Sequence, residues 1–220
     1  MAWREARAAA PPRRFAGQTY WARPVPGFGD PRARLLVLGL APAADGGNRT
    51  GRVFTGDRSG DFLYAALHRA GYANQPTSVA LDDGLRLRDC WVTAAVRCAP
   101  PANKPSPTER DTCLPWTVAE LSQLKRVRVV LCLGAFAWAA ALALREAAGL
   151  SNPRPRPRFG HGAVALDGGP LSLLGCFHPS QQNTFTGKLT EAMIDDVLVT
   201  GRALTDRNAG RRHDPASAGT

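Results

Sequence analysis

The chain has 220 residues, of which 44% are hydrophobic, with 22 glycines and 18 prolines. This composition supports a hydrophobic core and excludes a collagen, a coiled coil or a mostly disordered chain. The 28 Lys and Arg outnumber the 18 Asp and Glu, which gives a formal net charge of +10 and favours an acidic partner, most often DNA or RNA.

The sequence shows no pattern of a membrane span or of a secretion signal. Its longest uncharged run, residues 129–144, is shorter than the roughly 20 apolar residues that a span needs. Gly134 divides this run into a strand and an Ala-rich helix. The N-terminus lacks the apolar stretch of a signal peptide. We therefore expect a cytoplasmic protein that makes no membrane contact. We also expect a monomer that associates with the nucleoid.

Strand-like and helix-like segments alternate along the first half of the chain. Residues 34–39 (RLLVLG) predict a strand, and a Gly-rich loop follows over 40–60. A helix is expected over 61–70, with Gly71 ending it, and a second strand over 89–97. The Pro-rich stretch that comes next predicts a loop.

After the Pro-rich loop, the sequence predicts a helix that begins near Thr108. Thr108 and Asp111 have the spacing of a capping box. Apolar residues at helical spacing continue to Leu124. Pro115 lies inside this pattern and predicts a kink or a later start of the helix.

The rest of the chain predicts one more strand and helix, a hairpin and a final helix. Residues 127–133 form an apolar, strand-like run, and the Ala-rich helix after it ends near residue 148. Strand-like residues 163–166 and 171–177 flank a turn. The last helix is expected over 190–204.

Together these elements predict a three-layer α/β/α fold, doubly wound, with a central, mainly parallel sheet of about four strands. Residues 1–206 would form a single domain, and the polar residues 207–220 a disordered tail. Residues 152–158 (NPRPRPR) predict an exposed basic connection, which is either a solvated linker or a DNA contact.

Five cysteines without a secretion signal argue against disulfides. Cys90, Cys132 and Cys176 lie in apolar, strand-like runs and are expected to be small buried hydrophobes. Cys98 and Cys113 flank the Pro-rich loop instead. Two thiolates at loop positions have the chemistry of half a metal site, although the pair alone is a weak signal.

Three loops follow strand ends and carry polar groups, Gly or Pro, and a cation: residues 40–57, 98–105 and 178–188. In a parallel α/β sheet, ligands bind beyond the carboxyl ends of the strands, so these loops predict one shared site. The Gly-rich loop lacks both GxxxxGK[ST] and GxGxxG, which disfavours a nucleotide triphosphatase or a dinucleotide-binding enzyme.

Four side chains in these loops each allow two interpretations. Asp57 is a helix N-cap or a catalytic acid. His178, between a strand and Pro179, is a hydrogen-bond donor in a site or a packing residue. Phe54 is a core residue or a stacking platform for a base. Asn103 is a turn residue or an amide that binds a base edge.

The segments GLAPAADGGNRTGRVFTGD, VRCAPPANKP and HPSQQNTFTGKLT resemble the motifs of family 5 uracil-DNA glycosylases. The similarity extends over roughly residues 3–198. It implies a doubly wound α/β fold and a monofunctional DNA glycosylase of base excision repair. Such an enzyme excises uracil and other deaminated bases from double- and single-stranded DNA, leaving an abasic site. Family 4 carries Glu and Asn where this chain has Leu40 and Ala94, which favours family 5.

The resemblance also implies roles for individual residues. Asp57, Asn103 and His178 would be catalytic, with Asp57 stabilising the sugar cation and His178 the departing base. The expected substrate-binding residues are Phe54, Gly39, Leu40 and Ala41. The expected DNA-binding residues are Arg49, Arg52, Lys104, Gln181, Asn183 and Lys188.

These families hold a four-iron, four-sulfur cluster (4Fe–4S) on four cysteines, and the resemblance assigns two of them to Cys98 and Cys113. The other two form a CxxC motif that precedes the segment equivalent to residues 3–5. Because this motif is absent here, we expect the cluster to be incomplete in this chain. We also expect the natural coding sequence to extend upstream of Met1 and to encode a CxxC within about 20 residues.

Two other classes of function remain as alternatives. One is a catalytically weak nucleic-acid-binding module that lacks an intact iron–sulfur cluster. The other is a small-molecule nucleotide hydrolase, which the sequence disfavours because it has neither a phosphate-loop Lys nor a carboxylate cluster for Mg²⁺.

Overall fold

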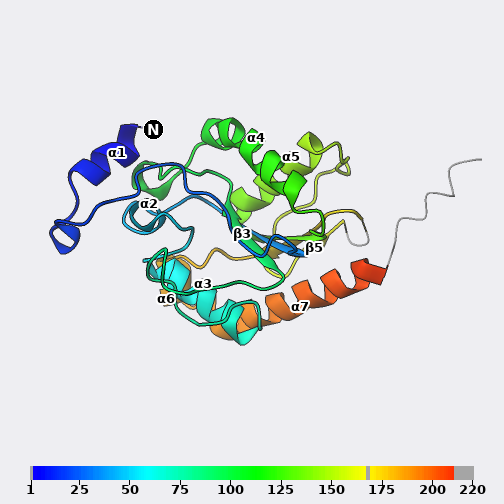
Figure 1. The fold of residues 1–220 in the computed structure, drawn as a ribbon. Coiled ribbons are helices and arrows are strands. Elements are labelled where there is room, and N and C mark those ends of the chain that lie inside the picture. The colour runs from blue at the N-terminus through cyan, green and yellow to red at the C-terminus, as the bar shows by residue number, and fades with distance from the viewer. Residues whose placement is uncertain (1, 167–168, 211–220) are drawn as a thin grey trace, which may run out of the picture.

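The computed structural model describes residues 2–166 and 169–210. It has a central six-stranded sheet in the order β1-β3-β2-β4-β6-β5, with helices on both faces (Figure 1). The strands are β1 Phe28–Gly29, β2 Leu35–Gly39, β3 Cys90–Ala94, β4 Val129–Leu133, β5 Val164–Ala165 and β6 Ser172–Cys176.

Parallel pairing joins the four inner strands. β2 lies between β3 and β4, and β6 pairs with β4 on the far side. Every residue of β2, β4 and β6 is buried, as expected for a parallel sheet covered on both faces. The predicted three-layer fold is therefore confirmed. The two edge strands, β1 and β5, pair in the antiparallel direction.

Two helix layers enclose the sheet, with α3 and α7 on one face and α4 and α5 on the other (Figure 1). Shorter helices and turns carry the loops. The helices are α1 Ala2–Ala9, α2 Gly47–Thr50, α3 Arg58–Arg69, α4 Pro107–Gln123, α5 Ala135–Ala147, α6 Gln181–Phe185 and α7 Glu191–Gly210, and the 3-10 turns are η1 Arg13–Phe15 and η2 Pro101–Asn103.

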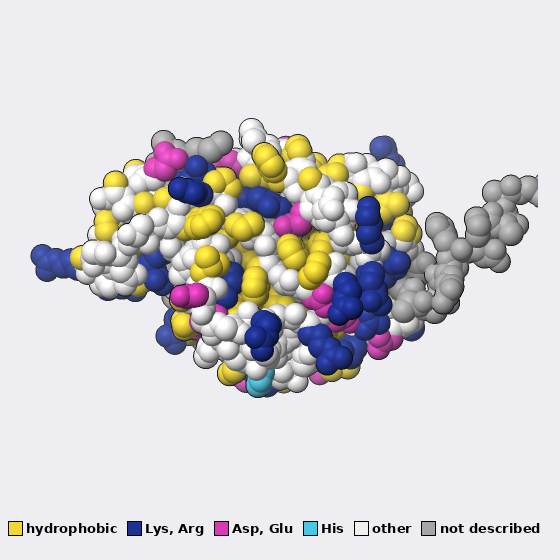
Figure 2. Space-filling model, in the orientation of Figure 1, with side chains coloured by type: hydrophobic (Ala, Val, Ile, Leu, Met, Phe, Trp, Pro, Cys, Tyr) yellow, Lys and Arg dark blue, Asp and Glu magenta, His cyan; other side chains and the backbone are white. Residues whose placement is uncertain are grey.

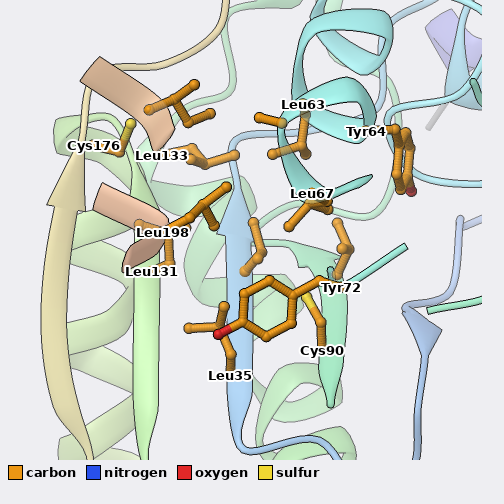
Figure 3. Close-up of a cluster of buried hydrophobic side chains, with 14 of the residues drawn as sticks. Leu35, Leu63, Tyr64, Leu67, Tyr72, Cys90, Leu131, Leu133, Cys176 and Leu198 are labelled. Atoms are coloured by element: carbon orange, nitrogen blue, oxygen red, sulfur yellow. The ribbon is translucent and has the colours of Figure 1, made fainter. Parts of the chain in front are cut away.

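Alternate residues of each inner strand pack against opposite helix layers. In β2, Leu35 and Val37 join the core under α3 and α7, whereas Leu36 and Leu38 join the core under α4 and α5. Figure 3 shows Leu63 and Leu67 of α3 packed over the first of these faces. Because burial on both faces requires apolar residues at every strand position, β2 reads as a continuous apolar run.

Helix α4 begins earlier than the sequence predicted and continues through Pro115. Ser106 is its N-cap: the Ser106 Oγ accepts from the Glu109 N–H at 3.1 Å, and Glu109 Oε2 accepts from the Ser106 N–H at 2.7 Å. This reciprocal pair, with Pro107 in the first turn, replaces the expected box on Thr108 and Asp111.

Two other helix boundaries differ from the prediction. Helix α3 begins at Arg58 rather than at residue 61, because Asp57 caps it. Helix α7 continues to Gly210, so the first four residues of the expected tail, 207–210, are helical. The rest of that tail, 211–220, lies outside the described residues. Within the described part of the chain, no helix has the length and apolarity needed to cross a membrane.

Candidate active site

The three loops predicted to share a site do so. Their residues line a hollow of about 540 Å³, here called the Phe54 pocket. An adjoining hollow of about 660 Å³, the Arg49 pocket, shares Ala43, Asp57, Arg58, Asn103 and Gln181 with it. The Phe54 pocket is lined by Leu40, Ala41, Ala43, Phe54, Asp57, Arg58, Ser59, Asn103, His178, Ser180, Gln181 and Gln182.

Asp57 is a helix N-cap, as one of its two interpretations predicted, and it also lines the pockets. Its backbone is extended, and its Oδ1 accepts the Gly60 N–H at 3.0 Å, which caps α3. The same carboxylate lines both pockets. Among the described residues, no Lys or Arg forms an ion pair with it. Burial raises the pKa of Asp57, and the nearby Asp61 charge adds to this shift.

Gly46 makes room for this carboxylate. A Cβ on Gly46 would overlap Asp57 Oδ2, so any side chain at this position would displace the carboxylate. The sequence does not predict this contact, because only the fold of the Gly-rich loop brings the two residues together.

His178 follows β6 directly and lines the Phe54 pocket. Its backbone carbonyl accepts a hydrogen bond of 2.9 Å from Asn183 Nδ2, which ties the loop to α6. Burial lowers the pKa of His178 to about 4, so the imidazole is neutral at pH 7. A neutral imidazole has one N–H donor and one acceptor nitrogen.

Phe54 packs beside the core and also faces the pocket. Its ring centroid lies 6.1 Å from that of His178, and the two planes are tilted by 36°. The residue adopts a positive φ of 52°, an uncommon conformation for an aromatic residue. Gly39 lies against the ring, where a Cβ would come within 2.6 Å of it. Gly39 therefore permits the position of Phe54 and is not itself in the pocket lining.

Asn103 ends the η2 turn of the Pro-rich loop and reaches both pockets. It and Ala102 have φ angles of 55° and 51°. Asparagine tolerates this left-handed region better than most residues. The turn therefore directs an exposed amide side chain toward the carboxylate loop, while the next residue, Lys104, is exposed outside the pocket lining.

The predicted DNA-binding residues divide into exposed and internally bonded groups. Gln181 and Lys188 are exposed, and Gln181 lines both pockets. Arg49 donates to the Asp45 carbonyl at 2.8 Å and to Gln18 Oε1 at 3.1 Å, and it also lines the Arg49 pocket. Asn183 uses its amide to hold the His178 carbonyl.

The prediction for Arg52 is wrong. Arg52 is 1% exposed and cannot reach a phosphate on the surface. Its Nη2 lies 2.6 Å from Asp83 Oδ2 and 2.8 Å from Ser78 Oγ, and its Nε lies 3.0 Å from Thr55 Oγ1. Arg52 therefore anchors the Gly-rich loop from inside. The hydrogen bond from Arg52, together with those from the backbone N–H groups of Leu85, Val79 and Ala80, lowers the pKa of Asp83 to about 2.

Asp45, the other acid of the Gly-rich loop, is neutralised by the N-terminal segment. Arg7 binds both of its carboxylate oxygens, at 2.9 and 2.7 Å, and the Tyr20 hydroxyl donates to it at 2.9 Å. These contacts lower the pKa of Asp45. Asp57 is thus the carboxylate of this loop that faces the pockets without a basic partner among the described residues.

Arg58 is a pocket residue that the sequence reasoning missed. It is exposed and lines both pockets. The available signal was its position directly after Asp57, at the start of α3.

The cysteines separate as predicted into buried and loop residues. Cys90, Cys132 and Cys176 are buried, and burial raises the pKa of each thiol. Cys98 and Cys113 are half-buried, and Arg4 Nη1 donates to Cys98 Sγ at 2.6 Å. Within residues 2–166 and 169–210, no three His, Cys, Asp or Glu residues are placed to hold a metal ion. The described residues therefore do not by themselves fit a cluster that needs four thiolates.

A three-layer α/β/α fold with this site has known relatives. The chain matches the family model of the Uracil DNA glycosylase superfamily over residues 26–199 and belongs to the type-5 uracil-DNA glycosylases of that superfamily.

Two relatives illustrate the extent of the match. The chain is 57% identical to the type-5 uracil-DNA glycosylase of Mycobacterium tuberculosis, over 93% of this chain and 75% of that protein. It is 51% identical to the type-5 enzyme of Thermus thermophilus, over 93% of this chain and 90% of that protein. Type-4 enzymes are more distant, as in Archaeoglobus fulgidus, at 32% identity over 51% of this chain.

The Arg52–Asp83 pair gives a stability prediction. Arg52→Met leaves a buried carboxylate without its partner, so the free energy of unfolding should fall by about 3–5 kcal/mol, measured by urea denaturation. Arg13→Met, at an exposed arginine, is the control and should change it little. Weaker DNA binding with unchanged stability would instead restore Arg52 as a phosphate ligand.

Gly46→Ala should displace the Asp57 carboxylate. If Asp57 has the catalytic role that the sequence predicts, single-turnover excision of uracil should slow by roughly 10- to 100-fold, because small misplacements of catalytic groups are costly. Gly160→Ala is the matched control, since its Cβ would meet only Ala163 Cβ, at an ordinary 3.4 Å. Equal rates for both variants would show that the position of Asp57 does not limit the reaction.

Proposed function

We propose that Asp57, Asn103 and His178 carry out the reaction of this glycosylase, the hydrolysis of the N-glycosidic bond between uracil and deoxyribose in DNA. The observation that carries the proposal is the pairing of a half-buried carboxylate, which has no basic partner among the described residues, with a neutral imidazole on the same pocket. The product is an abasic site, which base excision repair then processes.

The charges of the reaction match these two groups. Glycosidic cleavage develops positive charge on the sugar and negative charge on the leaving base, after the nucleotide has been flipped out of the duplex. The Asp57 carboxylate is suited to stabilise the cationic sugar and to orient the attacking water. Because no described basic residue neutralises Asp57, its negative charge is available to the sugar.

His178 is suited to the opposite charge. Its neutral imidazole can donate an N–H hydrogen bond to the oxygen of the departing base, where negative charge accumulates. With a pKa of about 4, His178 keeps the same protonation state from pH 5 upward. We therefore expect the acid limb of the pH–rate profile to report Asp57, at a pH above the ordinary Asp value of 3.8.

The rest of the pocket supports base binding with a broad range. Phe54 offers a ring face for stacking, and Asn103 offers an amide to a base edge. Leu40 and Ala41 line the same pocket with apolar groups. An apolar wall discriminates weakly between related bases, which supports excision of other deaminated bases besides uracil.

We propose that exposed cations beside the pockets hold the phosphates of double- and single-stranded DNA. Arg58, Lys104 and Lys188 are exposed and suited to this role, and Gln181 can contact the strand from the pocket rim. Figure 2 shows Lys and Arg side chains spread over the face in view. The net charge of +10 supports association with the nucleoid. We also propose a monomeric enzyme with a single domain over residues 1–206, which the packing of both core clusters against one sheet supports.

We further propose that Cys98 and Cys113 are two of the four ligands of a 4Fe–4S cluster. Their placement supports this, because both thiols are half-buried and lie outside the two hydrophobic core clusters, unlike Cys90, Cys132 and Cys176. When bound, such a cluster would stabilise the fold around the Pro-rich loop. The catalytic steps above use only side chains of the described chain.

Asp57→Asn tests the catalytic role and should also change how the stability of the protein depends on pH. Single-turnover excision should fall by at least about 100-fold, while binding to uracil-free duplex DNA stays unchanged. Burial raises the pKa of Asp57, so the fold binds its proton more tightly than the unfolded chain does. The parent therefore loses stability as the pH rises through that pKa, whereas the variant does not.

Since Asn also caps helices well, Asp57→Asn should have the higher melting temperature at pH 7, with the difference closing below about pH 4. Asp196→Asn, at an exposed acid of α7, is the control for both measurements. An excision rate equal to that of the parent would leave Asp57 as a helix cap only.

The cluster proposal predicts a spectroscopic difference. Protein that carries the cluster should be brown and absorb near the blue edge of the visible, and Cys98→Ser or Cys113→Ser in it should remove the colour. Cys132→Ser, at a buried thiol, should leave the absorbance unchanged. An absorbance that survives both loop substitutions would contradict the proposal.

A further inference from the structure

We infer that Phe185, backed by Arg58, is a stacking platform for an unstacked base next to the flipped nucleotide, an inference that rests on the proposed function. Phe185 is the last residue of α6 and is 68% exposed. The Arg58 guanidinium lies over its ring, 5.2 Å from the centroid. A large exposed aromatic under a cation presents one free face, which suits a nucleobase.

The platform adjoins the site already described. Phe185 lines a third hollow of about 400 Å³, the Phe185 hollow, which shares Arg58 with both pockets and Asp61 with the Arg49 pocket. Helix α6 starts at Gln181, in the pocket lining, and Phe185 is four residues further on. At 1.5 Å per residue this is about 6 Å, less than two base steps of a strand.

The charges of the Phe185 hollow favour a base over a phosphate. Asp61 lines it, forms no ion pair among the described residues, and would repel phosphate oxygens. The second arginine there, Arg69, is already paired, with Glu191 at 3.3 Å and with Asp195 at 2.9 Å. Phe62, Ala65 and the Phe185 ring supply apolar surface. An uncharged, flat ligand fits this combination, and a base freed from its stack is such a ligand.

The helix that carries Phe185 is fixed relative to His178. Ser180 caps α6, and Asn183 Nδ2 holds the His178 carbonyl at 2.9 Å. The Asn183 carbonyl in turn accepts the Leu189 N–H at 3.0 Å. Because these bonds set the platform at a constant position relative to the catalytic imidazole, stacking on Phe185 would favour the flipped state over the stacked duplex.

Phe185→Ala should weaken binding to a duplex that carries a tetrahydrofuran abasic analogue by roughly tenfold, measured by fluorescence anisotropy. Phe185→Trp should restore binding, because it keeps an aromatic face. Trp116→Ala is the control: Trp116 is 66% exposed on α4, which covers the opposite face of the sheet from α3 (Figure 1). Each variant should keep the melting temperature of the parent, since these side chains are exposed.

Removing single bases from the duplex identifies the base that stacks on Phe185. Two further duplexes lack either the base opposite the analogue or its neighbour on the same strand. The Phe185→Ala effect should disappear in one of them, and either outcome supports the platform and names its ligand. An effect that persists in both duplexes, or one no larger than that of Trp116→Ala, overturns the inference. This assay measures binding without excision. Failure of the proposed function would instead appear in a separate measurement, as absence of uracil excision by the parent protein.

Discussion

Parallel pairing of β2 with both β3 and β4 determines which loops can form a site. The register aligns Leu35 with Cys90 and with Val129, so the amino ends of these strands share one edge and the carboxyl ends share the other. β6 joins in the same direction. The Gly-rich, Pro-rich and His178 loops all leave the carboxyl edge, although they are far apart in the chain. The pocket residues come from these loops and from the helices that follow them.

Three aspartates in or near the Gly-rich loop have different pKa values because their surroundings differ. Asp45 is paired with Arg7, and Asp83 with Arg52, and both pKa values are lowered. Partial burial raises the pKa of Asp57, which has no basic ion-pair partner among the described residues, although two backbone N–H groups act in the opposite direction. A structural acid is stabilised by its partner, whereas a catalytic acid must keep its charge free for the substrate. The proposed role of Asp57 fits this difference, because its half-buried carboxylate has no basic partner among the described residues.

Three arginines in and next to the Gly-rich loop also differ in the acceptors that surround them. Arg52 is enclosed by oxygen acceptors and anchors the loop, Arg49 is divided between loop contacts and the pocket, and Arg58 is exposed at the pocket edge. All three lie within ten residues of one another. Net charge predicts an acidic partner for the whole chain, but the number of acceptors around each guanidinium decides which arginines can meet that partner.

The sequence by itself determined the layered fold, the loops that form the site and the family. Continuous apolar runs such as 129–133 require burial on both faces, and the motifs around Asp57, Asn103 and His178 are long enough to be specific. It missed the two-residue strand β1, whose length allows no periodic pattern. It also missed the burial of Arg52, because the acid that pairs with it lies 31 residues away. Only the tertiary structure decided that Gly46 clears the Asp57 carboxylate, that burial makes His178 neutral, and that Phe185 stands exposed under Arg58. Each of these depends on contacts between segments whose separation along the chain carries no local signal.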